Sequence, residues 1–408
     1  MTTHETIELA SQVLMPNYRR WPVAFVEGQG MRLWDAEGKE YLDFLAGIAV
    51  DVLGHCHPQH VRAIQQQATR LIHVSNLFQI PQQAELAALL VEATGIPQGK
   101  VFFCNSGAEA AEGAIKLARK AARVVRGRDA FEIVVADHGF HGRTMGALSA
   151  TMVPRYHEGF EPLVPGFVSV PPNDLGAVER AITPKTAAVF MEPIQGEGGI
   201  NPTDDEYLRG LRHLCEERGA WLILDEVQTG FGRTGRWFAY QHAGITPDIV
   251  TLAKGMGGGV PIGAFVARAQ LAEVLQPGTH GSTFAGSPLM CAAALAVVRA
   301  IREEGLVDHA AEMGAYFTAR LRDLATRHPE ITEVRGRGLM VAIQLTMPSE
   351  PVVAACLERG LVVNNVQPQA VRFVPPLIVE RNDIDDAIKI LDAALSAVGA
   401  EAGKAAAR

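Results

Sequence analysis

The sequence predicts an α/β fold: a large domain with a mostly parallel sheet covered by helices, and a smaller α+β domain. From Lys100 onward, short apolar runs alternate with helical patterns, which is typical of parallel sheets with helices on both faces. After Arg327 the pattern changes to several short strands and one closing helix. The length of 408 residues also favours more than one domain.

The part of the chain before Lys100 predicts a few local elements. Residues 1–35 are expected to form short turns and extended pieces. A hairpin is expected between residues 28–35 and 40–44, because Glu37-Gly38-Lys39 is a turn sequence between two strand-like runs. Apolar residues at helical spacing then predict two helices, at residues 60–73 and 84–93.

The large domain is expected to contain six strands. Their apolar runs are only four or five residues long, which suits buried strands. Helices lie between them, and one is expected to stop at Gly219, a typical C-cap residue. The expected strands are residues 101–104, 133–136, 187–191, 221–224, 249–253 and 263–267, and the clearest helices are residues 108–125 and 207–218.

Two long helices are expected before the smaller domain. Ser287 and Pro288 form a typical helix start, and Gly305 ends that helix after about Glu304. The second helix is expected at residues 310–327. The strands that follow are predicted at residues 331–334, 339–343, 361–363 and 371–373, and the closing helix at residues 383–398.

Composition narrows the class of protein. A net charge of -8 argues against a broad nucleic-acid surface. The five cysteines are odd in number and lack CxxC spacing, which indicates mostly buried free thiols in a reducing compartment. Residues 1–15 lack a signal-peptide core, and the longest apolar runs are too short to span a bilayer. A cytoplasmic protein without a membrane partner is therefore expected.

Two charged residues come at the ends of neighbouring apolar strands. Asp225 follows residues 221–224, and Lys254 follows residues 249–253. Ligands of open α/β sheets bind outside the carboxyl ends of the strands. A desolvated lysine there suits a Schiff-base nucleophile, and the aspartate could keep a pyridine nitrogen protonated. Each residue alone would more often be a surface lysine or a loop-capping aspartate.

Three loops after strands offer further candidate groups. Ser106 and Gly107 open a helix, whose N–H groups could bind an anion, although Ser106 alone is more often an ordinary N-cap. Phe140 could stack on a planar ring, and Arg143 could bind a carboxylate, or both could belong to a plain surface loop. Residues 192–199 bring two carboxylates in a glycine-rich loop, which could equally be solvated.

No metal site is expected. His55-Cys56-His57 is the only suggestive cluster, and such closely spaced residues do not easily converge on one ion. No second group of residues has ligand spacing.

Seven segments of the chain, taken together and in their sequence order, resemble the class III aminotransferases. The match extends from about Gly28 to Asp386. That family depends on pyridoxal 5'-phosphate (PLP) and has the fold-type-I architecture. The resemblance implies an N-terminal segment at residues 1–60 that joins the small domain and the dimer interface, a PLP-binding domain at 61–300 and a small domain at 301–408. The carrying segments are residues 53–58, 105–110, 140–144, 192–199, 224–230, 252–255 and 280–284.

The resemblance also implies roles at the cofactor. Lys254 would bind PLP covalently and later move a proton, and Asp225 would pair with the ring nitrogen. Gln228 would lie near the ring hydroxyl and Phe140 on the ring face, and Glu226 and Val227 would belong to the same site. The phosphate would be held by Ser106, Gly107 and Ala108, and by Thr283 of a partner subunit. Many family members have threonine where this chain has Ala108, so that side-chain contact is missing.

Substrate contacts are implied in the same way. Arg143 and Ser282 would contact the amino donor, and Arg372 would bind the α-carboxylate of glutamate and 2-oxoglutarate. Glu197 would pair with Arg372 during the other half-reaction, so that the terminal amine of the donor reaches the cofactor. A homodimer with a shared active site is implied as well.

Residues 46–50 and 371–377 are most similar to the acetylornithine aminotransferase branch of the family. This implies transfer of the terminal amine of N2-acetyl-L-ornithine to 2-oxoglutarate in arginine biosynthesis. Succinylornithine, N-succinyldiaminopimelate, ornithine and 4-aminobutyrate stay open as donors, because the sequence does not show the pocket shape. An aminomutase or racemase on the same scaffold would also carry these motifs, and so would a non-catalytic PLP-binding regulator. The regulator is disfavoured because Lys254 is present and no DNA-binding domain is added.

Overall fold

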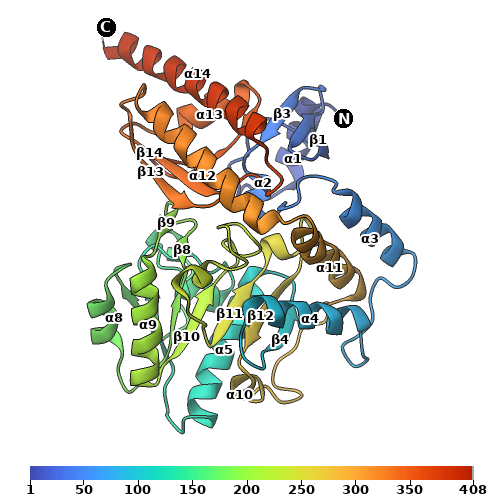
Figure 1. The fold of residues 1–408 in the computed structure, drawn as a ribbon, viewed down its shortest axis with the longest axis vertical. Helices are drawn as coiled ribbons and strands as arrows, with labels where there is room; N and C mark the ends of the chain where they lie inside the picture. The colour runs from blue at the N-terminus through green and yellow to red at the C-terminus, as the bar shows by residue number, and fades with distance from the viewer. Residues whose placement is uncertain (407–408) are drawn as a thin grey trace.

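The computed structural model describes the backbone of residues 1–406 and the side chains of residues 1–400. Its main feature is a seven-stranded sheet in the lower half of Figure 1. Six strands run in one direction, and only β12 is antiparallel to its neighbours β11 and β4. The predicted mostly parallel sheet is thus confirmed. In spatial order the strands are β4 (Lys100–Cys104), β12 (Gly263–Ala267), β11 (Ile249–Leu252), β10 (Trp221–Asp225), β7 (Thr186–Met191), β5 (Glu132–Ala136) and β6 (Phe167–Val170).

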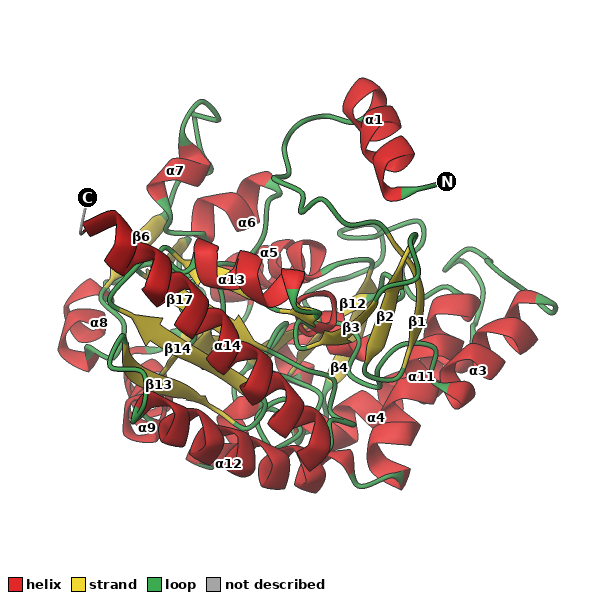
Figure 2. Cartoon of the chain, turned by 90° about the horizontal axis from the view of Figure 1, so that it is seen from above, coloured by secondary structure: helices red, strands yellow, loops and turns green. Residues whose placement is uncertain are grey.

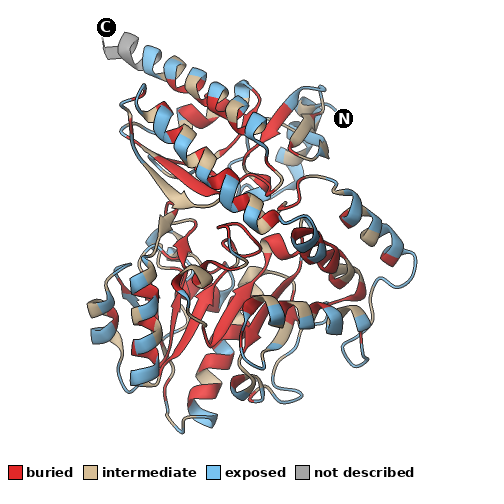
Figure 3. Ribbon diagram, viewed as in Figure 1, coloured by how far each residue is buried: buried red, intermediate tan, exposed pale blue. Residues whose placement is uncertain are grey.

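Both faces of this sheet are buried, as the red strands in Figure 3 show. Side chains alternate between the faces of a strand. In β10, Leu222 and Leu224 therefore join one core cluster, while Trp221 and Ile223 join another. The helix α5 packs against the second of these faces. The helices around the large sheet are α3 (Pro58–Ala68), α4 (Pro81–Thr94), α5 (Gly107–Val124), α8 (Leu175–Ala181), α9 (Asp205–Arg218) and α11 (Pro288–Glu303).

A second unit lies above the large sheet in Figure 1. Its antiparallel sheet has the order β13 (Ile331–Arg337), β14 (Met340–Leu345), β17 (Ala370–Phe373) and β16 (Asn364–Gln367). Figure 2 shows α12 and α14 lying along this sheet. The helices of this part are α12 (Leu306–Ala325), α13 (Glu350–Glu358) and α14 (Arg381–Ala406).

An N-terminal segment and a strand from the second unit meet in a third sheet. It consists of β1 (Phe25–Gln29), β2 (Arg32–Asp35), β3 (Glu40–Asp43) and β15 (Leu361–Val362). The predicted hairpin is the β2–β3 pair, with Arg32 opposite Leu42. Because β15 pairs with β3, residues from the beginning and the end of the chain share one sheet. The domain limits at residues 60 and 300 stay a prediction.

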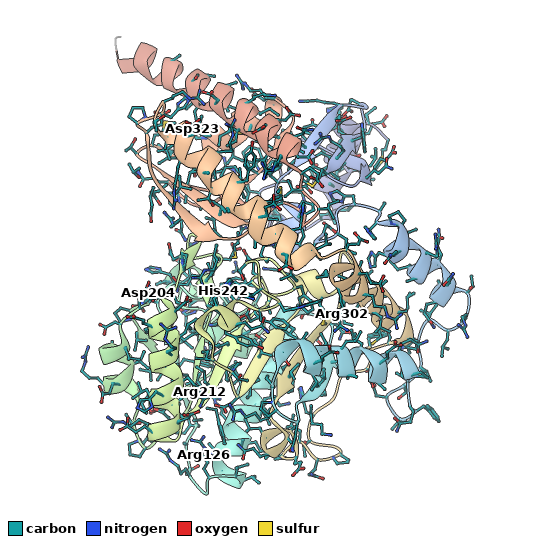
Figure 4. The ribbon with its side chains drawn as sticks, viewed as in Figure 1. Arg126, Asp204, Arg212, His242, Arg302 and Asp323 are labelled. Atoms are coloured by element: carbon teal, nitrogen blue, oxygen red, sulfur yellow. The ribbon has the colours of Figure 1, made fainter. Side chains whose placement is uncertain are left out.

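The carboxyl ends of the central strands point toward the second unit. At the other end, the Arg126 guanidinium stacks 3.5 Å from the ring centroid of Trp221, the first residue of β10. Arg212 bonds Asp248, which precedes β11, at 2.9 Å. Figure 4 labels both arginines at the lower end of the large sheet. The ends that carry Asp225 and Lys254 therefore lie at the junction of the two units.

The prediction for residues 1–35 was wrong in one respect. They include a helix, α1 (Thr3–Val13), that begins with a reciprocal capping box between Thr2 and Glu5. No residue of α1 is buried, and Figure 2 shows it standing apart from the rest of the fold. This helix has no apolar face in the core, and its sequence signal is the pair of capping hydrogen bonds at its N-terminus.

Other elements were outside the predictions or differ at their ends. The predicted helix at 60–73 stops at Ala68, and β6, α8, α13 and β16 were not predicted. The remaining short elements are α2 (Ala46–Ala49), α6 (Met145–Ala150), α7 (Pro154–His157), β8 (Ile194–Gln195), β9 (Asn201–Pro202), η1 (Ala239–Ala243), η2 (Lys254–Met256) and α10 (Ala269–Ala272).

Two features of the described residues concern membranes and metals. None of their helices is long and apolar enough to cross a membrane. Within the same part of the chain, no group of three or more His, Cys, Asp and Glu side chains is placed to hold a metal ion. The five cysteines are free, and only Cys56 is exposed.

Candidate active site

Asp225 and Lys254 line one small cavity of about 60 Å³ at the carboxyl end of the large sheet. β10 and β11 pair in parallel, so the residues at their ends are brought to the same edge. Phe140, Val227 and Gln228, which the sequence also singled out, line the same cavity. His141, Glu192, Ile194 and Thr229 complete its wall.

Asp225 is buried and held by two hydrogen bonds. Its Oδ2 lies 2.7 Å from Nδ1 of His141, and its Oδ1 accepts the N–H of Val227 at 3.0 Å. The His141 ring stacks on Phe190 of β7 with 3.9 Å between centroids. The imidazole is thereby fixed, and it orients the carboxylate of Asp225 toward the cavity.

Lys254 occupies an unusual backbone conformation. Its φ is 42°, a left-handed value that a non-glycine residue rarely adopts and that marks strain at functional sites. Burial lowers the pKa of its amine, Arg372 lowers the pKa further, and Glu197 and Asp225 oppose this. A lowered pKa gives more of the neutral, nucleophilic amine near neutral pH.

The start of α5 forms one wall of the site. The Ser106 Oγ accepts the N–H of Glu109 at 3.2 Å, so Ser106 is indeed an N-cap. A Cβ on Gly107 would lie 2.8 Å from Cγ1 of Val227, which lines the cavity. The helix terminus therefore approaches the cavity closely, and only glycine fits. The first N–H groups of a helix have no partner inside it and attract anions.

Arg143 is exposed and stacks on aromatic rings. Its guanidinium carbon lies 3.6 Å from the ring centroid of Tyr156 and 5.5 Å from that of Phe140. Among the described residues, no carboxylate lies within ion-pair distance of it. The arginine is thus held by ring faces and keeps its N–H donors available to a ligand.

Arg372 and Glu197 form a pair at the side of the cavity. Arg372 is fully buried on β17, and its Nη1 lies 2.5 Å from Oε1 of Glu197. Arg372 also donates to Oδ1 of Asn364 at 3.1 Å and to Oε1 of Gln228 at 3.2 Å. Burial would raise the pKa of Glu197, but Arg372 and Lys254 together hold that pKa below its usual value. Glu197 is therefore an ionised partner of a buried cation.

Two further glutamates are buried at the site. Burial raises the pKa of Glu192 to about 7, and its carboxylate accepts the N–H groups of Phe140 and Gly196. Burial likewise raises the pKa of Glu226 to about 7. Glu226 accepts from the Tyr240 N–H at 2.9 Å and from the Thr229 hydroxyl at 2.5 Å, and it does not line the cavity. Its side chain therefore supports the loop.

Ser282 and Thr283 lie away from this cavity. Ser282 Oγ accepts from Nδ2 of Asn105 at 3.0 Å and lines a separate cavity of about 180 Å³. Thr283 is exposed, and the neighbouring Phe284 is 63% exposed. Within one chain the structure thus does not bring these two residues together with Lys254.

Sequence reasoning missed some residues of the site. His141 and Glu192 stood in the quoted segments without a role, and their positions after strands were the signal that could have found them. Asn364, which bonds Arg372, lies on β16, a strand that was not predicted.

The geometry agrees with comparisons to known proteins. The family described as aminotransferase class III matches residues 13–395. The chain belongs to the class III aminotransferases. The predicted family and the fold-type-I architecture are therefore confirmed.

Curated relatives cover nearly the whole chain. Acetylornithine aminotransferase of Caldanaerobacter subterraneus is 49% identical over 96% of this chain and 99% of its own. The protein of the same name from Methanocaldococcus jannaschii is 50% identical over 96% of this chain and 98% of its own.

Solved aminotransferase structures are also similar. Ornithine aminotransferase of Toxoplasma gondii, a structure described as having partial PLP occupancy, has a TM-score of 0.94 at 37% identity and covers 98% of this chain and 96% of its own. Acetylornithine aminotransferase of Elizabethkingia anophelis has a TM-score of 0.87 at 33% identity, with 97% and 99% covered.

Proposed function

We propose that this enzyme transfers the terminal amine of N2-acetyl-L-ornithine to 2-oxoglutarate with PLP as cofactor. The products are N-acetyl-L-glutamate 5-semialdehyde and L-glutamate. The observation that carries the reaction type is the cavity shared by Lys254 and Asp225. The choice of donor is supported by the names of relatives at about 50% identity over 96% of the chain.

The residues present fit PLP. Phe140, Val227 and Asp225 all line the cavity, so an aromatic and an apolar side chain would contact a flat ring there and a carboxylate would be available to a ring nitrogen. The phosphate suits the N-terminus of α5, where Gly107 leaves room that a Cβ would fill. When bound, the cofactor supplies an aldehyde for the substrate amine and a ring that withdraws electrons.

Each residue would then have a defined task. Lys254 would hold the cofactor covalently and, once released by the donor amine, move a proton from the reacting substrate carbon. Asp225 would keep the ring nitrogen protonated, and His141 would orient Asp225 through the 2.7 Å contact. Phe140 would cover the ring face, with Gln228 near the ring hydroxyl.

Two substrates of different length would use the site in turn. Arg372 would bind the α-carboxylate of glutamate and 2-oxoglutarate. With acetylornithine, Glu197 would neutralise Arg372, as in the 2.5 Å pair seen here, and Arg143 would bind the donor carboxylate. Thr283, exposed in the single chain, would complete the phosphate site of a second copy in a homodimer, and Ser282 would contact the donor there.

Ornithine is the second candidate donor, because a solved ornithine aminotransferase superposes with a TM-score of 0.94. The two donors differ in the charge on the α-nitrogen. Purified holoenzyme should be assayed with acetylornithine, ornithine, succinylornithine, succinyldiaminopimelate and 4-aminobutyrate.

We expect the highest kcat/KM for acetylornithine and no turnover without an oxo-acid acceptor. A preference for another donor would reject the assigned substrate. Turnover without an acceptor would reject transamination. A Lys254→Ala variant serves as the inactive control.

A further inference from the structure

The loop that carries Glu197 is held from outside by the second unit. This loop turns between β8 and β9 on the large unit. Arg335, on β13, donates from Nε and Nη2 to the carbonyl oxygen of Gly199, at 2.9 and 2.7 Å. Gln367, at the end of β16, donates from Nε2 to the carbonyl oxygen of Glu197 itself at 2.8 Å. Two side chains thus bind the backbone on both sides of Gly198.

The same sheet also binds the Glu197 side chain. Arg372 stands on β17, between β14 and β16 in the sheet, and pairs with the Glu197 carboxylate at 2.5 Å. Backbone and side chain of Glu197 are therefore both bound by residues of the sheet β13–β14–β17–β16. The position of this carboxylate relative to Arg372 therefore depends on three residues of that sheet.

The loop conformation needs such support. Gly199 has φ 125° and Ile200 has φ 57°, both outside the usual range of L-residues. A Cβ on Gly199 would lie 3.3 Å from Nη2 of Arg335 and 3.4 Å from Cγ of Gln367. The bidentate arginine and the glutamine therefore fit closely around a backbone that would not adopt this shape by local preference.

We propose that Arg335 and Gln367 are positioning residues that hold Glu197 against Arg372, and so set the balance between the ω-amine donor and the dicarboxylate substrates. This inference rests on the proposed function. Arg335 and Gln367 are together called the clamp. With the clamp intact, Glu197 competes with glutamate, 2-oxoglutarate or any dicarboxylate for Arg372. Without it, the loop carrying Glu197 gains freedom, and Arg372 becomes more available to a substrate carboxylate.

The clamp lies beside open space. An open polar cavity of about 470 Å³ adjoins it and is lined by Arg335, Gln367, Gly198 and His138, among others. Water entering this space can replace the bond to a freed carbonyl. Arg335 also donates to Glu333 at 2.8 Å and to Gln344 at 3.1 Å. A variant at one of these partners is a matched control, because the bonds to Gly199 remain.

The test uses Arg335→Met and Gln367→Met holoenzymes, with Arg335→Lys as the conservative variant. Glu333→Gln is the control, since it removes the charge that pairs with Arg335 but spares the Gly199 bonds. Glu197→Gln is the reference for an Arg372 whose charge is no longer neutralised by the Glu197 carboxylate. Two quantities are measured: the Kd of glutarate, a dicarboxylate without an amine, by calorimetry, and the single-turnover kcat/KM of acetylornithine and of glutamate.

Gln367→Met should tighten glutarate binding about fivefold, the effect of losing one neutral hydrogen bond. Arg335→Met loses two bonds from a charged group and should tighten glutarate binding at least as much. The ratio of the acetylornithine to the glutamate kcat/KM should fall by a similar factor. Arg335→Lys should lie in between, Glu333→Gln should match the wild type, and Glu197→Gln should show the largest change.

Equal losses in both half-reactions with unchanged glutarate binding would reduce the clamp to a structural role and overturn the proposal. Unchanged glutarate binding in Glu197→Gln would overturn it too. Because glutarate binding involves no amino donor, it tests the clamp even if the wild type prefers a donor other than acetylornithine. Failure of the clamp and failure of the proposed function are therefore distinguishable.

Discussion

Arg143 is held by the Tyr156 ring at 3.6 Å and, in the described part of the chain, by no carboxylate. A guanidinium that is oriented but not neutralised suits a substrate carboxylate. Arg155 stacks on the same ring, 4.9 Å from its centroid, and offers a matched comparison.

We expect Arg143→Ala to lower kcat/KM for acetylornithine by about 10- to 100-fold, because a charge-assisted contact of roughly 1.5–3 kcal/mol is lost. The glutamate half-reaction should change much less, since it depends on Arg372. Arg155→Ala should leave both nearly unchanged. Single-turnover kinetics measure the two halves separately, and equal losses in Arg143→Ala would contradict its assigned role.

Glu226 makes stability depend on pH. Its pKa is raised from 4.5 to about 7 by burial. Because the pKa is higher in the folded state than in the unfolded state, the contribution of Glu226 to the free energy of unfolding is fully present below pH 4.5. This contribution, on the order of 3 kcal/mol, is lost as the pH rises through about 7. The stability of Glu226→Gln minus that of the wild type should therefore be more favourable at pH 8 than at pH 5.

The measurement is the Tm of wild type and variant at both pH values, with the exposed Glu303→Gln as control. Glu192 also has a raised pKa, but it is present in all three proteins and cancels in the comparison. A difference between Glu226→Gln and wild type that does not change with pH would show that Glu226 does not titrate as described.

At the scale of elements, α5 combines a binding role and a packing role. Its first residues approach the cavity, and its buried face packs on the large sheet. Gly113 marks the closest approach: a Cβ there would lie 2.3 Å from Cε1 of Phe265 on β12. Phe265 is itself buried and stacked on Phe102, so it cannot move aside easily.

Gly113→Ala should therefore destabilise the protein by about 1–3 kcal/mol, the usual effect of overpacking. Helix propensity alone predicts the opposite, a gain of about 1 kcal/mol. Lys120→Ala on the same helix is the control and should change stability little. Urea unfolding of the three proteins decides between packing and propensity, and a stabilised Gly113→Ala would contradict the close contact.

For the whole molecule, the site lies between two units that hold different parts of it. The large sheet carries Asp225 and Lys254, and the sheet of the second unit carries Arg372 with its clamp on the Glu197 loop. Thr283 is exposed in the single chain, which fits its proposed contribution to a second copy. Subunit mixing tests this arrangement.

Lys254→Ala should be inactive and Thr283→Val strongly impaired. If Thr283 acts across the dimer, a mixed dimer has one doubly defective site and one intact site. After equal mixing and subunit exchange, about a quarter of the sites should then be intact. Activity and sedimentation are measured together, and a mixture that stays as impaired as its parents would place Thr283 in its own subunit's site or in none.

Much of the fold could be predicted from local sequence. Short apolar runs became buried strands, and Gly219 ends α9 with φ 68°, as a left-handed C-cap requires. The helix α1 escaped prediction because it has no apolar core face, although Thr2 and Glu5 carried a capping signal. Local sequence indicates helices through apolar periodicity and through capping residues. A helix without a buried face has no apolar periodicity, so only its capping residues indicate it.

The sequence by itself determined six of the seven strands of the large sheet, the glycine turns and the family, and hence that Asp225 and Lys254 share one edge of a sheet. Only the tertiary structure decided which distant side chains meet there. His141 and Asp225 lie 84 residues apart, and Glu197 and Arg372 lie 175 apart. It also brought the Glu226 carboxylate to the Tyr240 N–H and set Arg335 on the Glu197 loop. Such contacts depend on the order of strands in a sheet and on how two sheets pack, which no local pattern encodes.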